Sequence, residues 1–199
     1  CGSEVTAECA IAIAEGRSNI NAVASQFGID VIAVDVGIAK DVECSLLVDR
    51  KIAYGTANIT RMPAMTNGQM MSAVKTGMDI VGELSHNGTN LVISGEMGIG
   101  NTTSASAVAS VLLGLPPEQV TGRGAGLSSE GLGRKINAVR SAIAVNSPNI
   151  DDCYDVLRKL GGLEMAAMTG LFLGGAFYHI PVVIDGVISA AAAAIAYGI

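Results

Sequence analysis

Residues 91–107, LVISGEMGIGNTTSASA, combine the residue types and the spacing that are best suited to chemistry. A short apolar run breaks into glycines, passes Glu96 and continues into a segment of small residues. Glycines let the backbone approach an oxyanion, and the amides and positive dipole end of a following helix can hold a phosphate without a charged side chain. We therefore expect a bound phosphate or nucleotide here, in contact with Gly98, Ile99, Gly100, Asn101, Thr102 and Thr103.

Two known phosphate-binding motifs match this loop only in part. The glycine spacing up to Gly100 is that of a P-loop, but Asn101 stands where that motif has its phosphate-binding lysine, which disfavours an NTPase. The dinucleotide motif GxGxxG fits at Gly98 and Gly100, whereas Thr103 occupies the third glycine position. The loop therefore shares with both motifs the glycines and the helix start that can bind a phosphate, but it matches neither motif in full.

Glu96 needs a positive partner, because a carboxylate beside a phosphate raises the electrostatic energy. We expect its carboxylate to face another part of the ligand, one that is cationic or donates a proton. The charge that balances the phosphate is predicted to come from Lys135 in EGLGRKI and from Arg123, which Gly124 follows in TGRGAG. For Lys135 the spacing is equally compatible with a solvated surface side chain.

Three apolar runs that read as strands end in an acidic residue and a glycine. Residues 31–37 offer Asp35, residues 91–98 offer Glu96, and residues 182–186 offer Asp185 and Gly186. Ligands of open parallel sheets bind beyond the carboxyl ends of the strands, so these loops are expected to converge on one crevice. The alternative for Asp35 and Asp185 is that each accepts hydrogen bonds from the amides of its own turn.

The remaining elements alternate between strand, loop and helix. A capping box at Thr66 and Gln69 predicts a helix that runs to about Leu84, and strands are predicted at residues 31–36, 90–94 and 181–185. Further helices are predicted at 4–27 (one or two), 102–113, 129–145, 151–160, 163–178 and after 186. This order predicts an α/β fold, a mainly parallel sheet flanked by helices in a Rossmann-like three-layer arrangement, with residues 1–199 as a single α/β domain.

The composition excludes several kinds of partner. A formal net charge of −6, no Trp and 4% aromatic residues leave neither a basic face nor a stacking surface, so nucleic acid is not expected as a partner. The two histidines are far apart in sequence and the cysteines form no CxxC pair, so neither a zinc site nor a disulfide framework is predicted. The cysteines are Cys1, Cys9, Cys44 and Cys153.

Residues 165–184, MAAMTGLFLGGAFYHIPVVI, raise the question of a membrane span because the run lacks charged residues and contains GxxxG at Gly170 and Gly174. His179 and Pro181 divide the run into a small-residue helix and a strand, which favours a buried core and predicts no membrane partner. Without a recognisable leader we expect a cytoplasmic protein. The first residue is not Met and the last apolar run has no cap, so we expect the core of a longer protein.

With these residues in hand, the chain resembles the nicotinate-nucleotide:dimethylbenzimidazole phosphoribosyltransferase family of cobalamin lower-ligand assembly. The stretches that carry the resemblance keep the family's order over most of the chain, and GEMGIGNTT with a downstream VIDG is a specific combination. Tyr54 and Ala125 depart from the family, which usually has Pro and Thr there. The stretches are VDVG, KIAYGTANITRMPAMT, SGEMGIGNTTSASA, TGRGAGLSSEGLGRK and GGLEMAAMTGLFLGGAFYHIPVVIDGVISAAAA.

The resemblance implies transfer of the 5-phosphoribosyl group from nicotinate mononucleotide to 5,6-dimethylbenzimidazole, with inversion, giving α-ribazole 5'-phosphate and nicotinate. It also implies a homodimer and no cofactor, since the pyridinium leaves readily and helix amides can hold a monophosphate without magnesium. The family's general base, a glutamate, lies beyond the last residue of this sequence and some base-contacting residues lie before its first, so Glu96 is expected to be auxiliary. Alternatives are a non-catalytic phosphate-binding domain, or the same transfer to another benzimidazole, a purine or a phenol.

Overall fold

The structure, a computed structural model, describes Gly2 and residues 4–199. The chain divides into two compact units. One comprises Cys1–Gly55 and Met97–Ile99, and the other comprises Thr56–Glu96 and Gly100–Ile199. The single domain predicted over residues 1–199 stays a prediction.

The first unit contains two helices and one pair of strands. Its helices are α1 (Glu4–Ala14) and α2 (Asn19–Gln26), so the predicted helical region at 4–27 is two helices, separated at Gly16 by a left-handed turn with φ 75°. The strands β1 (Val34–Asp35) and β2 (Val48–Asp49) pair in parallel, Val34 opposite Val48. Sequence reasoning missed β2, which is two residues long and carries no turn signal that marks it.

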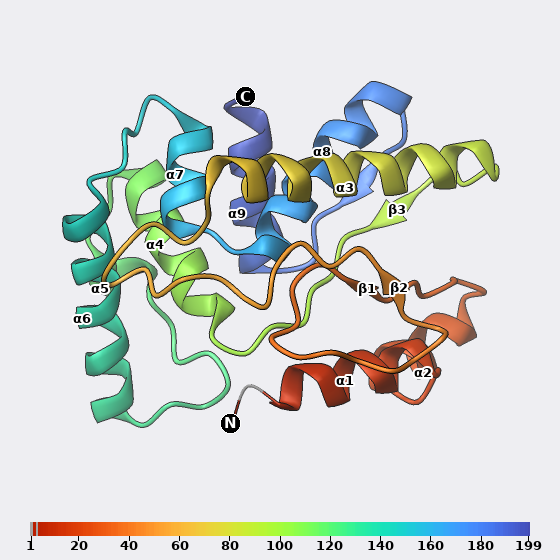
Figure 1. The fold of residues 1–199 in the computed structure, drawn as a ribbon, viewed down its shortest axis with the longest axis horizontal. Helices are drawn as coiled ribbons and strands as arrows, with labels where there is room; N and C mark the ends of the chain where they lie inside the picture. Colours follow the sequence, from red (N-terminus) through yellow and green to blue (C-terminus); the bar gives the residue numbers. More distant parts are fainter. Residues whose placement is uncertain (1, 3) are drawn as a thin grey trace. The chain divides into compact units, whose positions relative to one another are not determined.

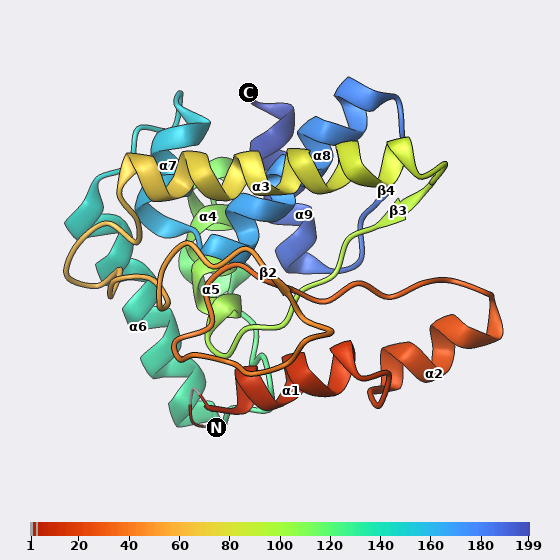
Figure 2. The ribbon, with the colours of Figure 1, turned by 45° about the vertical axis from the view of Figure 1, so that its right-hand side comes forward.

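The second unit is helical around one short parallel ladder. Figure 2 shows β3 (Val92–Ile93) beside β4 (Val182–Val183), with Val92 opposite Val182. Seven helices of the described residues belong to this unit: α3 (Asn67–His86), α4 (Asn101–Leu113), α5 (Pro117–Val120), α6 (Ser129–Asn146), α7 (Cys153–Leu160), α8 (Leu163–Tyr178) and α9 (Val187–Tyr197).

The longest helix, α3, begins at the predicted capping box. The amide of Gln69 donates to Oγ1 of Thr66 over 3.2 Å, and the amide of Thr66 donates to Oε1 of Gln69 over 2.9 Å. Each side chain therefore satisfies one amide that a helix start leaves without an intrahelical partner. The prediction of this helix is confirmed, and it ends at His86 rather than Leu84.

Glycines bring α3 and α8 into close contact, and Figure 1 shows the two helices lying along each other. A Cβ added at Gly77 would lie 1.9 Å from the carbonyl oxygen of Ala167, and one added at Gly170 would lie 1.9 Å from that of Val74. The GxxxG spacing of the apolar run thus serves helix packing within the protein. Across the part of the chain that the structure describes, no helix combines the length and the hydropathy that crossing a membrane requires.

The predicted α/β class with parallel strand pairing is confirmed, but one parallel sheet covered on both sides is not. Strands predicted over four to six residues are two residues long, and they form two separate pairs. Ile93 is 51% exposed and Val183 is 42% exposed, whereas strands inside a parallel sheet are covered on both faces. Among the described residues, each ladder consists of two strands that pair over two residues, so most of each apolar run lies outside the ladder.

The proline pair Pro116 and Pro117 follows the end of α4. This helix ends at Leu113, as predicted, with Gly114 in the left-handed conformation. Pro117 also begins the one-turn helix α5, because a proline at the first helical position loses no hydrogen bond and has a suitable φ.

Candidate functional site

The ends of β3 and β4 bring two predicted acidic residues to the same edge of the ladder. The amide and Oγ of Ser94 both donate to the carbonyl oxygen of Val183, over 3.0 and 2.8 Å. Because the strands are parallel, Glu96 after β3 and Asp185 after β4 leave from the same end. The negative charge of Asp185 accordingly contributes to raising the pKa of Glu96.

Glu96 is held by Asn101 in the first turn of α4. Partial burial of its carboxyl raises the pKa of Glu96 although the residue as a whole is exposed, and Asp185 adds to this. The side-chain amide of Asn101 donates to Oε2 of Glu96 and lowers its pKa. Asn101, which replaces the lysine of a P-loop, therefore orients the carboxylate of Glu96.

Lys135 is buried against the start of α4. The residue is 7% exposed, and its Nζ donates to Oγ1 of Thr102 over 2.7 Å and to the carbonyl oxygen of Gly122 over 3.1 Å. Burial lowers the pKa of Lys135, since removal from water disfavours the charged form. The solvated-surface alternative for Lys135 is wrong, because α6 packs beside α4 and carries this side chain inward.

Gly124 leaves room for this lysine. Its φ is +56°, and a Cβ there would lie 2.9 Å from Oγ1 of Thr102 and 3.4 Å from Nζ of Lys135. Arg123, next to it, donates to the carbonyl oxygen of Leu127 over 2.7 Å and to Oγ of Ser129 over 3.1 Å. The guanidinium thus stabilises its own loop before α6, and its predicted contact with a phosphate stays a prediction.

The first residues of α4 are arranged for amide donation. Gly100 precedes the helix in the left-handed conformation with φ 96°, and an α-helix provides no intrahelical acceptor for its first amides, such as those of Asn101 and Thr102. The amide of Thr103 donates to the carbonyl oxygen of Gly100 over 2.9 Å. Anion binding at residues 98–103 stays a prediction.

Gly98 and Ile99 belong to the first unit, and their predicted contact with a phosphate stays a prediction. Within that unit the amide of Ile99 donates to Oγ1 of Thr6 over 3.2 Å. The loop GEMGIGN is therefore shared between the two units, which its sequence did not indicate.

Two further acidic positions differ in what surrounds them. Ser189, in the first turn of α9, accepts from the amides of Asp185 and Gly186 over 3.0 and 2.9 Å, so the turn after β4 does not use its own carboxylate for these amides. In the first unit, Asp35 accepts from the amides of Gly37 and Ile38. Asp35 therefore follows the alternative interpretation, in which the carboxylate accepts hydrogen bonds from the amides of its own turn.

Asp35 also forms a buried ion pair. Its Oδ2 lies 2.7 Å from Nζ of Lys51, and Asp35 is 3% exposed. The same Nζ donates to the carbonyl oxygens of Ile38 and Lys40 over 2.7 and 3.0 Å. These bonds hold the turn after β1 and explain an acidic residue there without a ligand.

Sequence reasoning did not single out Glu164, at the start of α8. Its carboxyl interacts with its own backbone amide, and Oε1 is buried without a hydrogen-bond partner among the described residues. Burial raises the pKa of Glu164 to about 7, and the charge of Glu96 contributes to the rise. The one signal in the sequence was a lone acidic residue after two glycines within an apolar run, GGLEMAAM.

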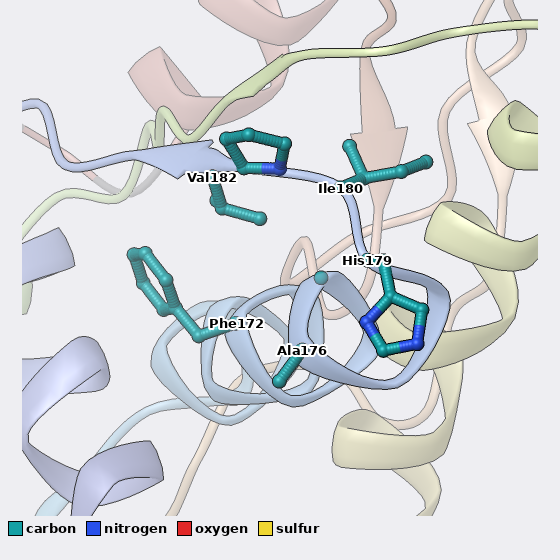
Figure 3. A pocket seen from close by; sticks show the side chains of 7 residues that line it. Phe172, Ala176, His179, Ile180 and Val182 are labelled. Atoms are coloured by element: carbon teal, nitrogen blue, oxygen red, sulfur yellow. The ribbon is translucent and has the colours of Figure 1, made fainter.

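A shallow hollow of about 330 Å³ lies at the other end of β4, where the chain leaves α8 (Figure 3). Phe172 of α8 points toward Val182 of β4, and His179 and Ile180 complete the lining where the chain leaves the helix. The hollow is lined by none of the predicted site residues. Gly2 and residues 4–199 contain no group of three His, Cys, Asp or Glu side chains that could hold a metal ion. Cys1, one of the four cysteines considered above, lies outside the described residues.

Parallel strands with acidic and glycine-rich loops at one end, and a buried lysine beside the amides of a helix start, are an arrangement that suits the binding of an anion. A family model described as "Phosphoribosyltransferase" matches residues 1–199, and the chain belongs to this family. The family resemblance read from the sequence is thereby confirmed.

Curated relatives carry a more specific name. The chain is 46% identical over 193 residues to the nicotinate-nucleotide--dimethylbenzimidazole phosphoribosyltransferase of Ruminiclostridium cellulolyticum, covering 97% of this chain and 55% of the relative. An enzyme of the same name from Acetivibrio thermocellus is also 46% identical, with the same coverage. The chain thus spans about half the length of the curated relatives it matches.

A solved structure shows the same fold. The crystal structure of CobT from Thermus thermophilus superposes with a TM-score of 0.94 at 37% identity, covering all of this chain (100%) and 60% of that one. The arrangement described above is therefore that of the corresponding part of CobT.

Proposed function

We propose that the full-length protein transfers the 5-phosphoribosyl group of nicotinate mononucleotide to 5,6-dimethylbenzimidazole, giving α-ribazole 5'-phosphate and nicotinate, in cobalamin biosynthesis. The printed activity of the relatives supports this substrate pair. The observation that carries the proposal is Lys135, a buried ammonium whose Nζ reaches the first turn of α4. A buried cation at a helix start, where amides point outward, suits a phosphate monoester.

In this proposal the phosphate binds at the start of α4, held by the amides of residues 98–103 and by Lys135, with Arg123 and Gly124 at the edge. The same site extends to the turn of Asp185 and Gly186. Lys135 then offsets the charge of the phosphate, and Gly124 leaves the approach open because it has no side chain. Binding of this kind requires no metal ion.

Glu96 has an auxiliary catalytic role in the proposal. When the glycosidic bond breaks, nicotinate leaves with its ring nitrogen neutral, and positive charge develops on the anomeric carbon of the ribosyl group. A carboxylate close to that carbon stabilises the charge. Inversion requires the incoming base to attack from the opposite face, with its ring proton passing to a carboxylate. We assign that general base to a glutamate outside this sequence, as the family resemblance implies.

The proposal extends to the setting of the enzyme. We propose a cytoplasmic homodimer with no nucleic-acid partner, in which the Rossmann-like three-layer arrangement is a property of the full-length protein. The alternative is that the same transfer reaction uses a different acceptor, namely another benzimidazole, a purine or a phenol.

The test is a transfer assay on the full-length protein, with nicotinate mononucleotide and each acceptor, followed by chromatography and mass spectrometry of the ribotide product. We expect α-ribazole 5'-phosphate and an equal amount of nicotinate. A protein that binds nicotinate mononucleotide but releases no nicotinate with any acceptor would support the non-catalytic binding domain instead.

A further inference from the structure

Glu164 presents a buried polar atom that the fold does not satisfy. Its Oε1 has no hydrogen-bond partner among the described residues, while the carboxyl interacts with its own backbone amide at the start of α8. A buried oxygen without a partner costs free energy, and native proteins rarely keep one without a reason. A ligand group that bonds to this oxygen would supply that reason.

The space for the carboxyl is provided by Gly162. A Cβ at this position would lie 2.5 Å from Oε1 and 2.6 Å from Oε2 of Glu164. The φ of Gly162 is −136°, which any residue adopts, so the backbone does not require glycine here. The carboxyl of Glu164 occupies the space that a Cβ at position 162 would take, and a side chain there would have to displace it.

Topology places Glu164 at the site end of the ladder. Helix α8 leads through His179–Pro181 into β4, so it runs back against the strand, and its first turn lies toward the end of β4 from which Asp185 follows. Glu96 follows β3 at that end, and its charge acts on Glu164. Glu96 thus acts on Glu164 from the end of β3, and Asp185 acts on Glu96 from the end of β4.

The charged groups of the neighbouring helices are engaged with one another. Lys75 pairs with Asp79 on α3, and Arg158 and Lys159 pair with Asp155 on α7. Helix α4 contains no charged residue, and α9 contains none either. Glu96 is the charged residue that acts on Glu164, and Asp185 acts on Glu96.

We propose that Glu164 is a further binding residue of this site and that its neutral carboxyl donates an O–H hydrogen bond to a hydroxyl of the ribosyl group. The proposal rests on the proposed function, because the ribosyl ligand comes from it. A hydroxyl-bearing ligand satisfies the unpartnered oxygen. A second ionised carboxyl beside Glu96 is electrostatically unfavourable, whereas a neutral one donates a hydrogen bond at no such cost.

The experiment measures dissociation constants of ribose 5-phosphate and nicotinate mononucleotide by calorimetry at pH 6 and pH 8.5, in the full-length protein. Glu164→Gln resembles the neutral carboxyl, Glu164→Ala removes it, and Glu8→Gln on the exposed face of α1 is the matched control. The ratio of variant to wild-type Kd cancels the ionisation of the ligand's own phosphate. Thermal unfolding of each variant confirms that it is folded.

We expect Glu164→Gln to bind like the wild type at pH 6 and about tenfold more tightly than the wild type at pH 8.5, because ionisation depletes the competent wild-type form. Glu164→Ala should bind about tenfold more weakly than the wild type at pH 6, the loss of one hydrogen bond. Ratios of one for both variants at both pH values would overturn the proposal, even if melting temperatures change. So would a Gln variant as weak as the Ala variant.

Failure of the proposed function has a separate signature. A wild type that binds both ligands with the expected Glu164 dependence, but transfers no ribosyl group to any acceptor, would overturn the transfer reaction and support Glu164. A wild type that binds neither ligand would overturn both.

Discussion

At the scale of the residue, three side chains of the proposed site owe their character to partial or full burial. Burial raises the pKa of Glu96 and of Glu164, and it lowers the pKa of Lys135. Glu96 keeps a hydrogen bond from Asn101, while Oε1 of Glu164 has none among the described residues. The two carboxyls therefore suit different tasks, one as a charge and the other as a neutral donor.

Glu96→Gln tests the charge of that glutamate. The change keeps shape and hydrogen-bonding capacity, so we expect turnover to fall roughly ten- to a thousandfold with little change in nucleotide affinity, as for an interaction made mainly in the transition state. Steady-state kinetics and calorimetry on the full-length protein measure both. Glu43→Gln, an exposed carboxylate, should leave both unchanged. Near-normal turnover, with only thermal stability lost, would assign Glu96 to the loop's structure.

Lys135→Ala tests the proposed contact of this lysine with the phosphate. We expect nicotinate mononucleotide to bind more weakly by about 1 to 3 kcal/mol, the loss of a charge-assisted hydrogen bond. Lys75→Ala removes the same charge from an exposed side chain of α3 that pairs with Asp79, and it should leave binding unchanged. Unchanged affinity of the Lys135 variant would restrict this lysine to holding Thr102 and Gly122.

At the scale of the element, α3 and α8 are held together by the absence of side chains. Gly77 and Gly170 let the two backbones approach to a distance that no Cβ allows. The helix pair in turn fixes where α8 begins and where β4 follows. Close packing of these helices thus positions Glu164 and Asp185.

Gly170→Ala should destabilise the protein by at least about 2 kcal/mol, because the new methyl group meets backbone that cannot move aside easily. Gly133→Ala is the matched control, since a Cβ there meets nothing within 4 Å on the exposed face of α6. That change should stabilise by about 0.5 to 1 kcal/mol, because glycine is a poor helix residue. Urea unfolding of both variants measures the difference, and equal effects would contradict this account of the helix contact.

At the scale of the whole molecule, stability depends on pH through groups whose pKa changes on folding. The pKa of Glu164 is raised to about 7 from 4.5, so folding favours its neutral form. Its contribution is full below pH 4.5 and is lost as pH rises toward 7. The pKa of Asp155 shifts the other way: burial raises it, but the Asn149 amide, Lys159 and Arg158 outweigh burial and lower it. Its contribution is lost only in acid.

We therefore expect the free energy of unfolding to fall by about 3 kcal/mol between pH 4.5 and pH 8 on account of Glu164. Each unit by which folding shifts the pKa contributes about 1.4 kcal/mol. Glu164→Gln should remove most of this decline and be more stable than the wild type at pH 8. Urea unfolding at several pH values measures it. Parallel profiles for the variant and the wild type would show that Glu164 ionises freely in the folded protein.

Local chemistry in the sequence was sufficient for much of the helical structure. The capping box at Thr66 and Gln69 and the breaks after residues 113 and 160 depend on neighbours within a few residues, and the predicted helices there are confirmed. Strand length was not predictable in the same way. Each ladder depends on a partner many residues away, and the apolar runs alone did not reveal that pairing stops after two residues.

Residue types and their spacing were enough to identify the family, the helix order and the glycine loop with Glu96. The folded structure was needed to find that Lys135 is buried against Thr102, that Asp35 pairs with Lys51, and that the charge of Glu96 raises the pKa of Glu164. These contacts join side chains from segments that are tens of residues apart in sequence and pack together in the fold. A local sequence pattern does not indicate which distant segments will be in contact.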